Sequence, residues 1–225
     1  MQADFNRPVL AVDTGTSRLS LALRADGETR LFHQEVGSRQ SELILPEIRT
    51  LFRDAGITAA DLGAVVYEQG PGAFTGLRIG IGVAQGLATP FDTPLIGVPS
   101  LDAAASLPPP QSCILAATDA RMGEVFYAWF DTLNCRRLSD YQVGRAADIR
   151  LPEGCAFSDG IGSAFALEEA PPFSGRPDMP TAADFLALAA KGGYPAVHAA
   201  DAGLLYVRNK IALTAKEQAE RRARP

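Results

Sequence analysis

The stretch PVLAVDTGTSRLSLALRADGETRLFHQEV, residues 8–36, sets the pattern from which the fold can be worked out. It begins with an apolar run that ends in the polar turn Asp13-Thr14-Gly15-Thr16-Ser17. Two segments of alternating polar and apolar residues follow, and Asp26-Gly27 joins them. An Asp-Gly pair between such segments is a strong signal for a β-hairpin. The stretch therefore predicts three consecutive strands, with a polar turn directly after the first.

Helical and strand patterns alternate after these strands. Residues 41–55 place apolar side chains at helical spacing, and Pro46 lies near the start, where a missing N–H costs least. LGAVVYEQ, residues 62–69, and PLIGVPS, residues 94–100, have the pattern of buried strands on either side of a glycine-rich segment. The order β-β-β-α-β-α-β predicts an α/β lobe with a mixed sheet.

A second lobe is predicted beyond the three prolines of SLPPPQ, residues 106–111. Two strands, CILAATDA and EVFYAWF, flank the turn Arg121-Met122-Gly123, and TAADFLALAAKGG predicts a helix capped by Thr181. We therefore expect an N-terminal lobe over residues 1–105 and a C-terminal lobe over residues 106–225. The polar end, KEQAERRARP, is expected to form a tail that can pack back on the first lobe.

Composition excludes several classes of protein. The net charge of −5 argues against a chain that grips nucleic acid unaided, because phosphate contacts need concentrated Lys and Arg. The three cysteines form no CxxC pair, so neither a disulfide framework nor a zinc knuckle is indicated. No stretch approaches the roughly 18 apolar residues that a membrane span requires. We expect a cytoplasmic protein that does not enter a membrane.

The glycine-rich segment EQGPGAFTGLRIGIGVAQGLA, residues 68–88, invites a nucleotide-loop interpretation that its spacing excludes. A P-loop requires Lys and a hydroxyl residue after its last glycine, but Leu77 and Arg78 follow Gly76. Gly80, Gly82 and Gly86 leave one residue too many for a dinucleotide fingerprint. The segment instead predicts a tight turn that leads into a helix from about Thr75 to Ala88, with Thr75 as the cap.

This helix needs a reason to tolerate its glycines, because each interior glycine costs about 1 kcal/mol relative to alanine. Close approach of another helix would offset the cost, and an apolar stripe of Leu77, Ile81, Ala84 and Ala88 could receive it. Two alternatives stay open: the glycines pack within the chain's own core, or they pack against a partner protein.

The turn at residues 13–17 carries the second functional hypothesis. In actin-like and sugar-kinase folds, a DxGT turn after the first strand offers N–H groups and hydroxyls to phosphate, which makes Asp13, Thr14, Gly15 and Thr16 candidates for a weak nucleotide site. The second phosphate hairpin of such enzymes has no match here, because the segment from Asp119 to Gly123 lacks the DxG spacing. A free-standing small-molecule kinase or ATPase, with Asp13 and Thr16 at phosphate and Asp119 as base, is the alternative.

Metal-dependent and nucleophilic mechanisms lack their residues. The two histidines, His33 and His198, have no second His or Cys at ligand spacing, and neither HExxH nor GxSxG occurs. Carboxylates are plentiful, but none is paired with a feature that would mark it as an acid or base. We therefore expect no metal site and no catalytic residue.

Taken together, these motifs resemble the bacterial TsaB (YeaZ) family. The resemblance rests on VLAVDTGTS, SELILPEI, the ungapped GPGAFTGLRIG, VPSLDA and TDARMGEVFYA, which follow in order over about the first 130 residues. MPTAADFLALAA and LLYVRNKIA are similar to the family's C-terminal elements. The resemblance implies a two-lobed actin-like (ASKHA, ribonuclease H-like) α/β fold with mixed sheets flanked by helices.

The resemblance also implies a function and partners. Members act in placing threonylcarbamoyl on N6 of adenosine 37 in tRNAs that read codons beginning with adenine. They are non-catalytic relatives of the transferase TsaD, which they bind through a helical face, and the ATPase TsaE joins the pair. A glycoprotease label given to the family by analogy has no support in these residues.

From this resemblance we expect a scaffold that contacts tRNA through its complex and forms a homodimer when alone. The chain alone is expected to bind no cofactor, and any ATP would lie at the interface of the complex. Gln40 departs from the family, whose members carry histidine at that position. The residues predicted at the partner interface are Glu42, Leu45, Arg49, Gly76, Leu77, Gly80, Ile81, Gly82 and Ala84.

Overall fold

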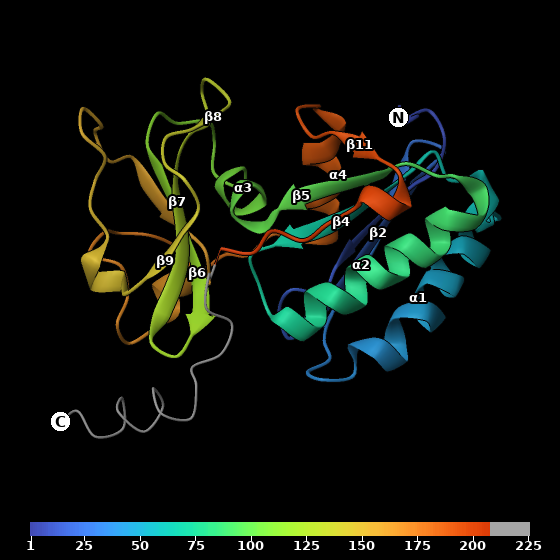
Figure 1. Cartoon of the computed structure of the whole chain (residues 1–225), viewed down its shortest axis with the longest axis horizontal. Helices are drawn as coiled ribbons and strands as arrows, with labels where there is room; N and C mark the ends of the chain where they lie inside the picture. The colour runs from blue at the N-terminus through green and yellow to red at the C-terminus, as the bar shows by residue number, and fades with distance from the viewer. Residues whose placement is uncertain (208–225) are drawn as a thin grey trace.

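A computed structural model of the chain describes residues 1–207 as two α/β lobes joined side by side (Figure 1). None of the helices in this part of the chain is long and apolar enough to cross a bilayer. Short 3₁₀ turns lie at Ala59–Asp61, Thr89–Phe91, Ala146–Asp148, Ser163–Ala166 and Ala199–Asp201. The helices and strands are β1 (Val9–Asp13), β2 (Arg18–Ala25), β3 (Glu28–Glu35), α1 (Gln40–Ala55), β4 (Ala64–Gly70), α2 (Phe74–Ala88), β5 (Leu95–Pro99), α3 (Ser100–Ala105), β6 (Ile114–Arg121), β7 (Glu124–Asp131), β8 (Arg136–Arg137), β9 (Gln142–Gly144), β10 (Asp159–Ile161), α4 (Ala182–Ala190) and β11 (Ala196–Val197).

The first lobe is built on a mixed sheet with the strand order β11-β5-β4-β1-β2-β3. Strands β1, β2 and β3 pair antiparallel, whereas β4 and β5 run parallel to β1. Asp26 and Gly27 both have positive φ in the turn between β2 and β3, which confirms the predicted hairpin. The predicted mixed sheet is therefore present.

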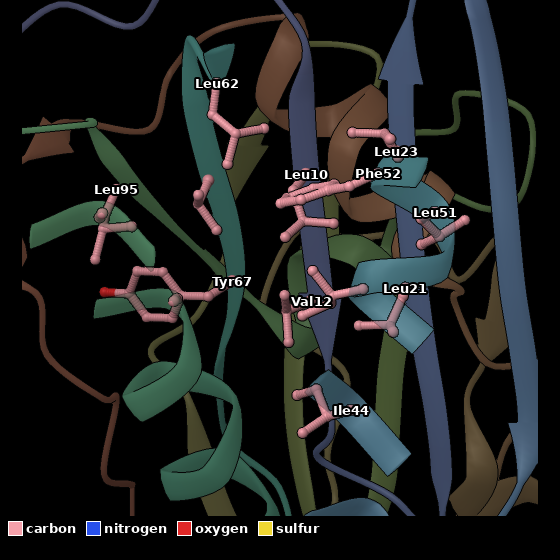
Figure 2. Packing of buried hydrophobic residues seen from close by; sticks show 14 of the residues in the cluster. Leu10, Val12, Leu21, Leu23, Ile44, Leu51, Phe52, Leu62, Tyr67 and Leu95 are labelled. Atoms are coloured by element: carbon pink, nitrogen blue, oxygen red, sulfur yellow. The ribbon is translucent and has the colours of Figure 1, made fainter. Parts of the chain in front are cut away.

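Helices α1 and α2 lie side by side over one face of this sheet (Figure 1). Figure 2 shows Val12 and Leu21 of the sheet meeting Ile44, Leu51 and Phe52 of α1 in the largest buried cluster. The alternation of the strands sends their other residues to the opposite face, where α4 covers them. Each face of the first sheet thus has its own apolar layer.

The second lobe repeats part of this plan. Its sheet has the order β10-β6-β7-β8, and β9 also pairs with β7. Strands β6 and β7 form an antiparallel hairpin, and β10 runs parallel to β6, as β4 does to β1. The predicted two-lobed actin-like fold, with mixed sheets flanked by helices, is confirmed.

The predicted lobe boundary is wrong for the later part of the chain. Helix α4 contacts β1, β2, β4 and β5, and β11 pairs with β5, so both belong to the first lobe and not to the second. The N–H of Ala182 donates to the Ser20 hydroxyl at 2.8 Å and fixes the start of α4 on the first sheet. The predicted tail, KEQAERRARP, lies outside the described residues.

Candidate functional site

Helix α2 presses two of its glycines against the polar turn after β1. The Thr14 hydroxyl donates to the carbonyl of Gly76 at 2.8 Å. A Cβ atom on Gly76 would overlap the Thr14 carbonyl oxygen, and one on Gly80 would overlap the Thr14 hydroxyl. Both glycines are buried. Glycine is therefore needed at these inner positions because the Thr14 backbone fills the space beside Gly76 and the Thr14 side chain fills the space beside Gly80.

The other two glycines of the helix face outward. Gly82 and Gly86 are exposed, and apart from the neighbouring backbone of α2 itself no described atom lies within 4 Å of the position that a Cβ would take at either residue. The structure thus answers the question that the sequence left open for the inner pair, and packing against a partner stays a prediction for the outer pair. The inner pair packs within the chain, and these outer glycines do not.

This division corrects the predicted interface. Five of its members form part of the first lobe's own interior and are covered by the chain itself, namely Gly76, Leu77, Gly80, Ile81 and Ala84. The prediction that α2 begins with a Thr75 cap is also wrong, because the helix starts at Phe74 and Ala73 occupies the cap position without a side-chain hydrogen bond.

Four predicted interface residues remain on the surface and stay predictions. Glu42, Leu45 and Arg49 are exposed on α1, and Gly82 is exposed on the neighbouring helix. The Leu45 side chain is 52% exposed, and Glu42 accepts from Arg39 at 3.1 Å. We call the surface formed by Glu42, Leu45, Arg49, Gly82 and Gly86 the α1–α2 face.

Two carboxyl groups of the chain, those of Asp13 and Glu68, lie side by side at the polar turn. Asp13 ends β1 and lies beside Glu68 of β4, since Val12 and Tyr67 are paired in the parallel register. Both side chains are only 5% exposed. Burial raises the pKa of Asp13, and the nearby Glu68 charge raises it further. Burial also raises the pKa of Glu68, while the Asp13 carboxyl, the Ser100 hydroxyl and the N–H groups of the turn lower it. We therefore expect the two groups to share a buried proton over part of the pH range.

The Glu68 carboxylate lies directly against Gly15 of the polar turn. A Cβ on Gly15 would overlap both carboxylate oxygens of Glu68, so the glycine is required for this close contact. The Ser100 hydroxyl donates to Glu68 Oε1 at 2.6 Å. Sequence reasoning missed Glu68, although a single acid in the apolar strand LGAVVYEQ was a signal for it. A second carboxylate beside the turn disfavours an anionic ligand there.

The predicted nucleotide residues consequently separate into two groups. Asp13 faces Glu68, and the Thr14 hydroxyl is used by α2. Gly15 and Thr16 line a cleft of about 860 Å³ between the lobes. Asp119, the base of the alternative kinase hypothesis, also lines this cleft and forms an ion pair with Arg121 at 3.1 Å. The structure therefore does not bring Asp13 to the cleft that holds Thr16 and Asp119.

Gln40 ties the first helix to the same turn. Its buried amide Nε2 lies 3.2 Å from the carbonyl of Thr14, 2.6 Å from that of Thr16 and 3.1 Å from that of Arg18. An amide with two N–H groups serves such a ring of acceptors well. The role of Gln40 is thus to hold the turn, and the sequence signal was only its departure from histidine.

The two histidines occupy unrelated places. His33 lines the interlobe cleft, and burial followed by the Arg18 charge lowers its pKa. On the surface, His198 Nδ1 lies 3.0 Å from Asp92 Oδ1. Within residues 1–207, no group of three or more His, Cys, Asp or Glu side chains is placed to hold a metal ion.

Comparisons with known proteins show which family the chain is similar to. A family model described as TsaD, tRNA N6-adenosine threonylcarbamoyltransferase, matches residues 33–156. The chain is 41% identical over 123 residues to the tRNA threonylcarbamoyladenosine biosynthesis protein TsaB of Escherichia coli (strain K12), which covers 53% of each chain. It is 32% identical over 128 residues to TsaB of Bacillus subtilis (strain 168), or 56% of each chain. The matches span about half the length of these curated relatives.

A solved structure extends the similarity beyond this half. YeaZ from Pseudomonas aeruginosa superposes with a TM-score of 0.77 and 30% sequence identity, over 88% of this chain and 99% of that chain. The α1 and α2 helices and the β6–β7 hairpin all fall within residues 33–156, which the family model matches. The chain therefore belongs to the TsaB (YeaZ) family.

Proposed function

We propose that this chain is a scaffold subunit in the biosynthesis of threonylcarbamoyladenosine in tRNA. In this proposal it docks through the α1–α2 face against the catalytic transferase TsaD, and the ATPase TsaE joins the pair in the cytoplasm. The chain itself supplies no catalytic residue to the transfer of threonylcarbamoyl to N6 of adenosine 37. It affects the reaction only as part of the complex.

The observation that carries the proposal is the pair of outer glycines. Gly82 and Gly86 each cost about 1 kcal/mol of helix stability, and no described atom of the chain uses the space that they leave. A bare helix surface lets another backbone approach closely. The exposed Leu45 on the neighbouring helix adds apolar area to the same face. These features favour a partner helix over a small ligand.

The state of the polar turn supports a role as a scaffold. An actin-like kinase needs its first aspartate at the cleft, and Asp13 instead faces Glu68 under the surface. With TsaD present, ATP is proposed to bind at the interface of the complex and not in this turn. In isolation, the same face is proposed to pair with a second copy, because a self-complementary surface gives a two-fold dimer.

Reconstitution tests the proposal against its enzymatic alternative. Purified chain, TsaD and TsaE are combined with unmodified tRNA, an activated threonylcarbamoyl donor, ATP and magnesium, and the threonylcarbamoyladenosine content is measured with each protein left out in turn. We expect modification to require all three proteins and the chain alone to show no magnesium-dependent ATP turnover. Turnover by the chain alone that is lost in Asp119→Asn would favour the small-molecule kinase or ATPase.

A further inference from the structure

Helix α3 lies between the cores of the two lobes. Ala103 packs in the first-lobe cluster, whereas Leu101, Ala104 and Ala105 pack in the second-lobe cluster. The helix accordingly contacts β4 and β5 on one side and β6 and β7 on the other. A change in the angle between the lobes must therefore act on α3.

Asp102 of this helix joins one tyrosine from each side. The Tyr141 hydroxyl donates to Asp102 Oδ1 at 2.6 Å, and the Tyr194 hydroxyl donates to Asp102 Oδ2 at 3.1 Å. Tyr141 packs against the second-lobe cluster and Tyr194 against the first-lobe cluster. Both carboxylate oxygens are thus used, and each one holds a different lobe.

The surroundings of the three side chains keep the two tyrosine hydroxyls protonated as donors and Asp102 charged as their acceptor. Burial raises the pKa of Asp102, and the two tyrosine hydroxyls and Arg137 lower it. Burial and the Asp102 charge raise the pKa of both Tyr141 and Tyr194, so their hydroxyls keep the protons that they donate. The Arg137 guanidinium lies 4.0 Å from the centre of the Tyr141 ring and places a positive charge beside the carboxylate.

Open space adjoins the cluster. A cavity of about 300 Å³ is lined from both lobes, by Tyr67 and Gly97 of the first sheet and by Arg137 and Tyr141 of the second lobe. The larger interlobe cleft of about 860 Å³ involves the start of α2 and the tip of the β6–β7 hairpin. In Figure 1, α3 and β8 lie toward the upper edge of the junction, and that hairpin tip lies toward the lower edge. The two open spaces between the lobes therefore leave room for the lobes to turn about α3.

We propose that Asp102, Tyr141 and Tyr194 form an interlobe latch that fixes the angle between the two lobes and so sets how far the interlobe cleft opens. The two hydrogen bonds are made to a charged acceptor in a part-buried setting, where they are stronger than bonds between neutral groups. This role is separate from docking at the α1–α2 face, since none of the three residues lies on α1 or α2.

A spin-label distance measurement on the full chain tests the latch. Cys135→Ser and Cys155→Ser remove the accessible thiols, while the buried Cys113 stays in place. Labels are attached at Gln34→Cys on β3 and Glu153→Cys in the second lobe, both at exposed positions. We expect Tyr141→Phe and Tyr194→Phe each to shift and broaden the distance distribution. In hydrogen exchange, we expect the α3 amides of Tyr141→Phe to exchange about tenfold faster.

The matched control is Tyr127→Phe, whose hydroxyl donates to Gln142 Oε1 at 2.9 Å within the second sheet. This control should leave both readouts as in the parent chain. Asp102→Asn keeps the volume of the side chain but offers a single acceptor oxygen, so it should broaden the distribution at least as much as either tyrosine variant. The latch is refuted if all three latch variants superpose on the parent, or if Tyr127→Phe broadens the distribution equally.

Discussion

The inner and outer glycines of α2 are the same residue in the same helix, and they carry the same intrinsic cost. Gly76 and Gly80 face the Thr14 turn, where any side chain would meet the chain's own backbone or hydroxyl. Gly82 and Gly86 face open space. Contacts within the chain therefore require glycine on one side of the helix and do not require it on the other. The inner pair is explained by the fold alone, whereas no contact within the described residues explains the outer pair, for which we propose a partner protein.

The largest effect is expected at the inner pair. In Gly76→Ala, the new Cβ overlaps the Thr14 carbonyl oxygen, and backbone cannot move aside cheaply. The gain in helix propensity is about 1 kcal/mol, but overpacking against fixed backbone should lower the free energy of unfolding by about 3 kcal/mol. Urea unfolding followed by circular dichroism measures the change. Unchanged or increased stability would contradict the claim that contact with Thr14 requires glycine at the inner positions.

The pH dependence of stability sharpens the account of the turn on which the inner pair rests. The carboxyl pKa values of Asp13 and Glu68 are raised in the folded chain from ordinary values of 3.8 and 4.5. The folded state therefore holds a proton that the unfolded state releases, so this contribution is full below about pH 4 and is lost as pH rises through the folded pKa.

Glu68→Gln provides the comparison for this pH effect. Relative to the variant, the parent chain should lose stability above about pH 4.5, with a slope of up to about 1.4 kcal/mol per pH unit for one shared proton. Urea midpoints at intervals from pH 4 to pH 8 give the slope. Parallel profiles for the two proteins would show that the carboxyl groups do not share a proton.

An intermediate effect is expected from Gln40→Ala, which removes the amide that holds the turn against α1. Three carbonyl groups around Gln40 Nε2 would lose their donor, two of which belong to Thr14 and Thr16. The free energy of unfolding should fall by about 2 kcal/mol. Glu47→Ala, on the same helix but without a role in the turn, serves as the control. Equal losses in both variants would point to a general effect on α1.

The smallest effect, with the opposite sign, is expected at the outer pair. In Gly82→Ala the new methyl meets no atom of the described chain, so helix propensity alone acts. Thermal and urea unfolding of the isolated chain, at a concentration where it is monomeric, should show a gain of about 1 kcal/mol. A loss of stability would mean that Gly82 is needed by the fold, and the contrast between the two pairs would fail.

Local patterns predicted much of this structure. The Asp26-Gly27 hairpin, the helix over residues 41–55 and the β6–β7 hairpin depend on neighbours in sequence, and the structure has them. The return of α4 to the first sheet could not be predicted, because it depends on contacts between segments more than 150 residues apart, such as Ser20 with Ala182. The pairing of Asp13 with Glu68 was missed because these two residues also meet only through the tertiary fold.

The sequence could partly predict which glycines of α2 face the core and which face outward. At 100° per residue, Gly82 lies about 200° around the helix from Gly80, on nearly the opposite side. Leu77 and Ala84 fall within about 60° of Gly80 on the wheel and share its burial. What the spacing could not supply was the identity of the neighbour, because Thr14 reaches α2 only through the tertiary fold.

The most direct test of the central claim is a calorimetric titration of TsaD into the parent chain and into Gly82→Leu. The claim is that the outer glycines are kept for a partner, so the variant should be at least as stable as the parent when alone. It should nevertheless lose measurable binding to TsaD, because a leucine would hold the two helices apart. Gly144→Leu, at a second-lobe glycine that also has no atom within 4 Å of its Cβ position, should bind like the parent. Equal affinity of Gly82→Leu and the parent chain would contradict the account.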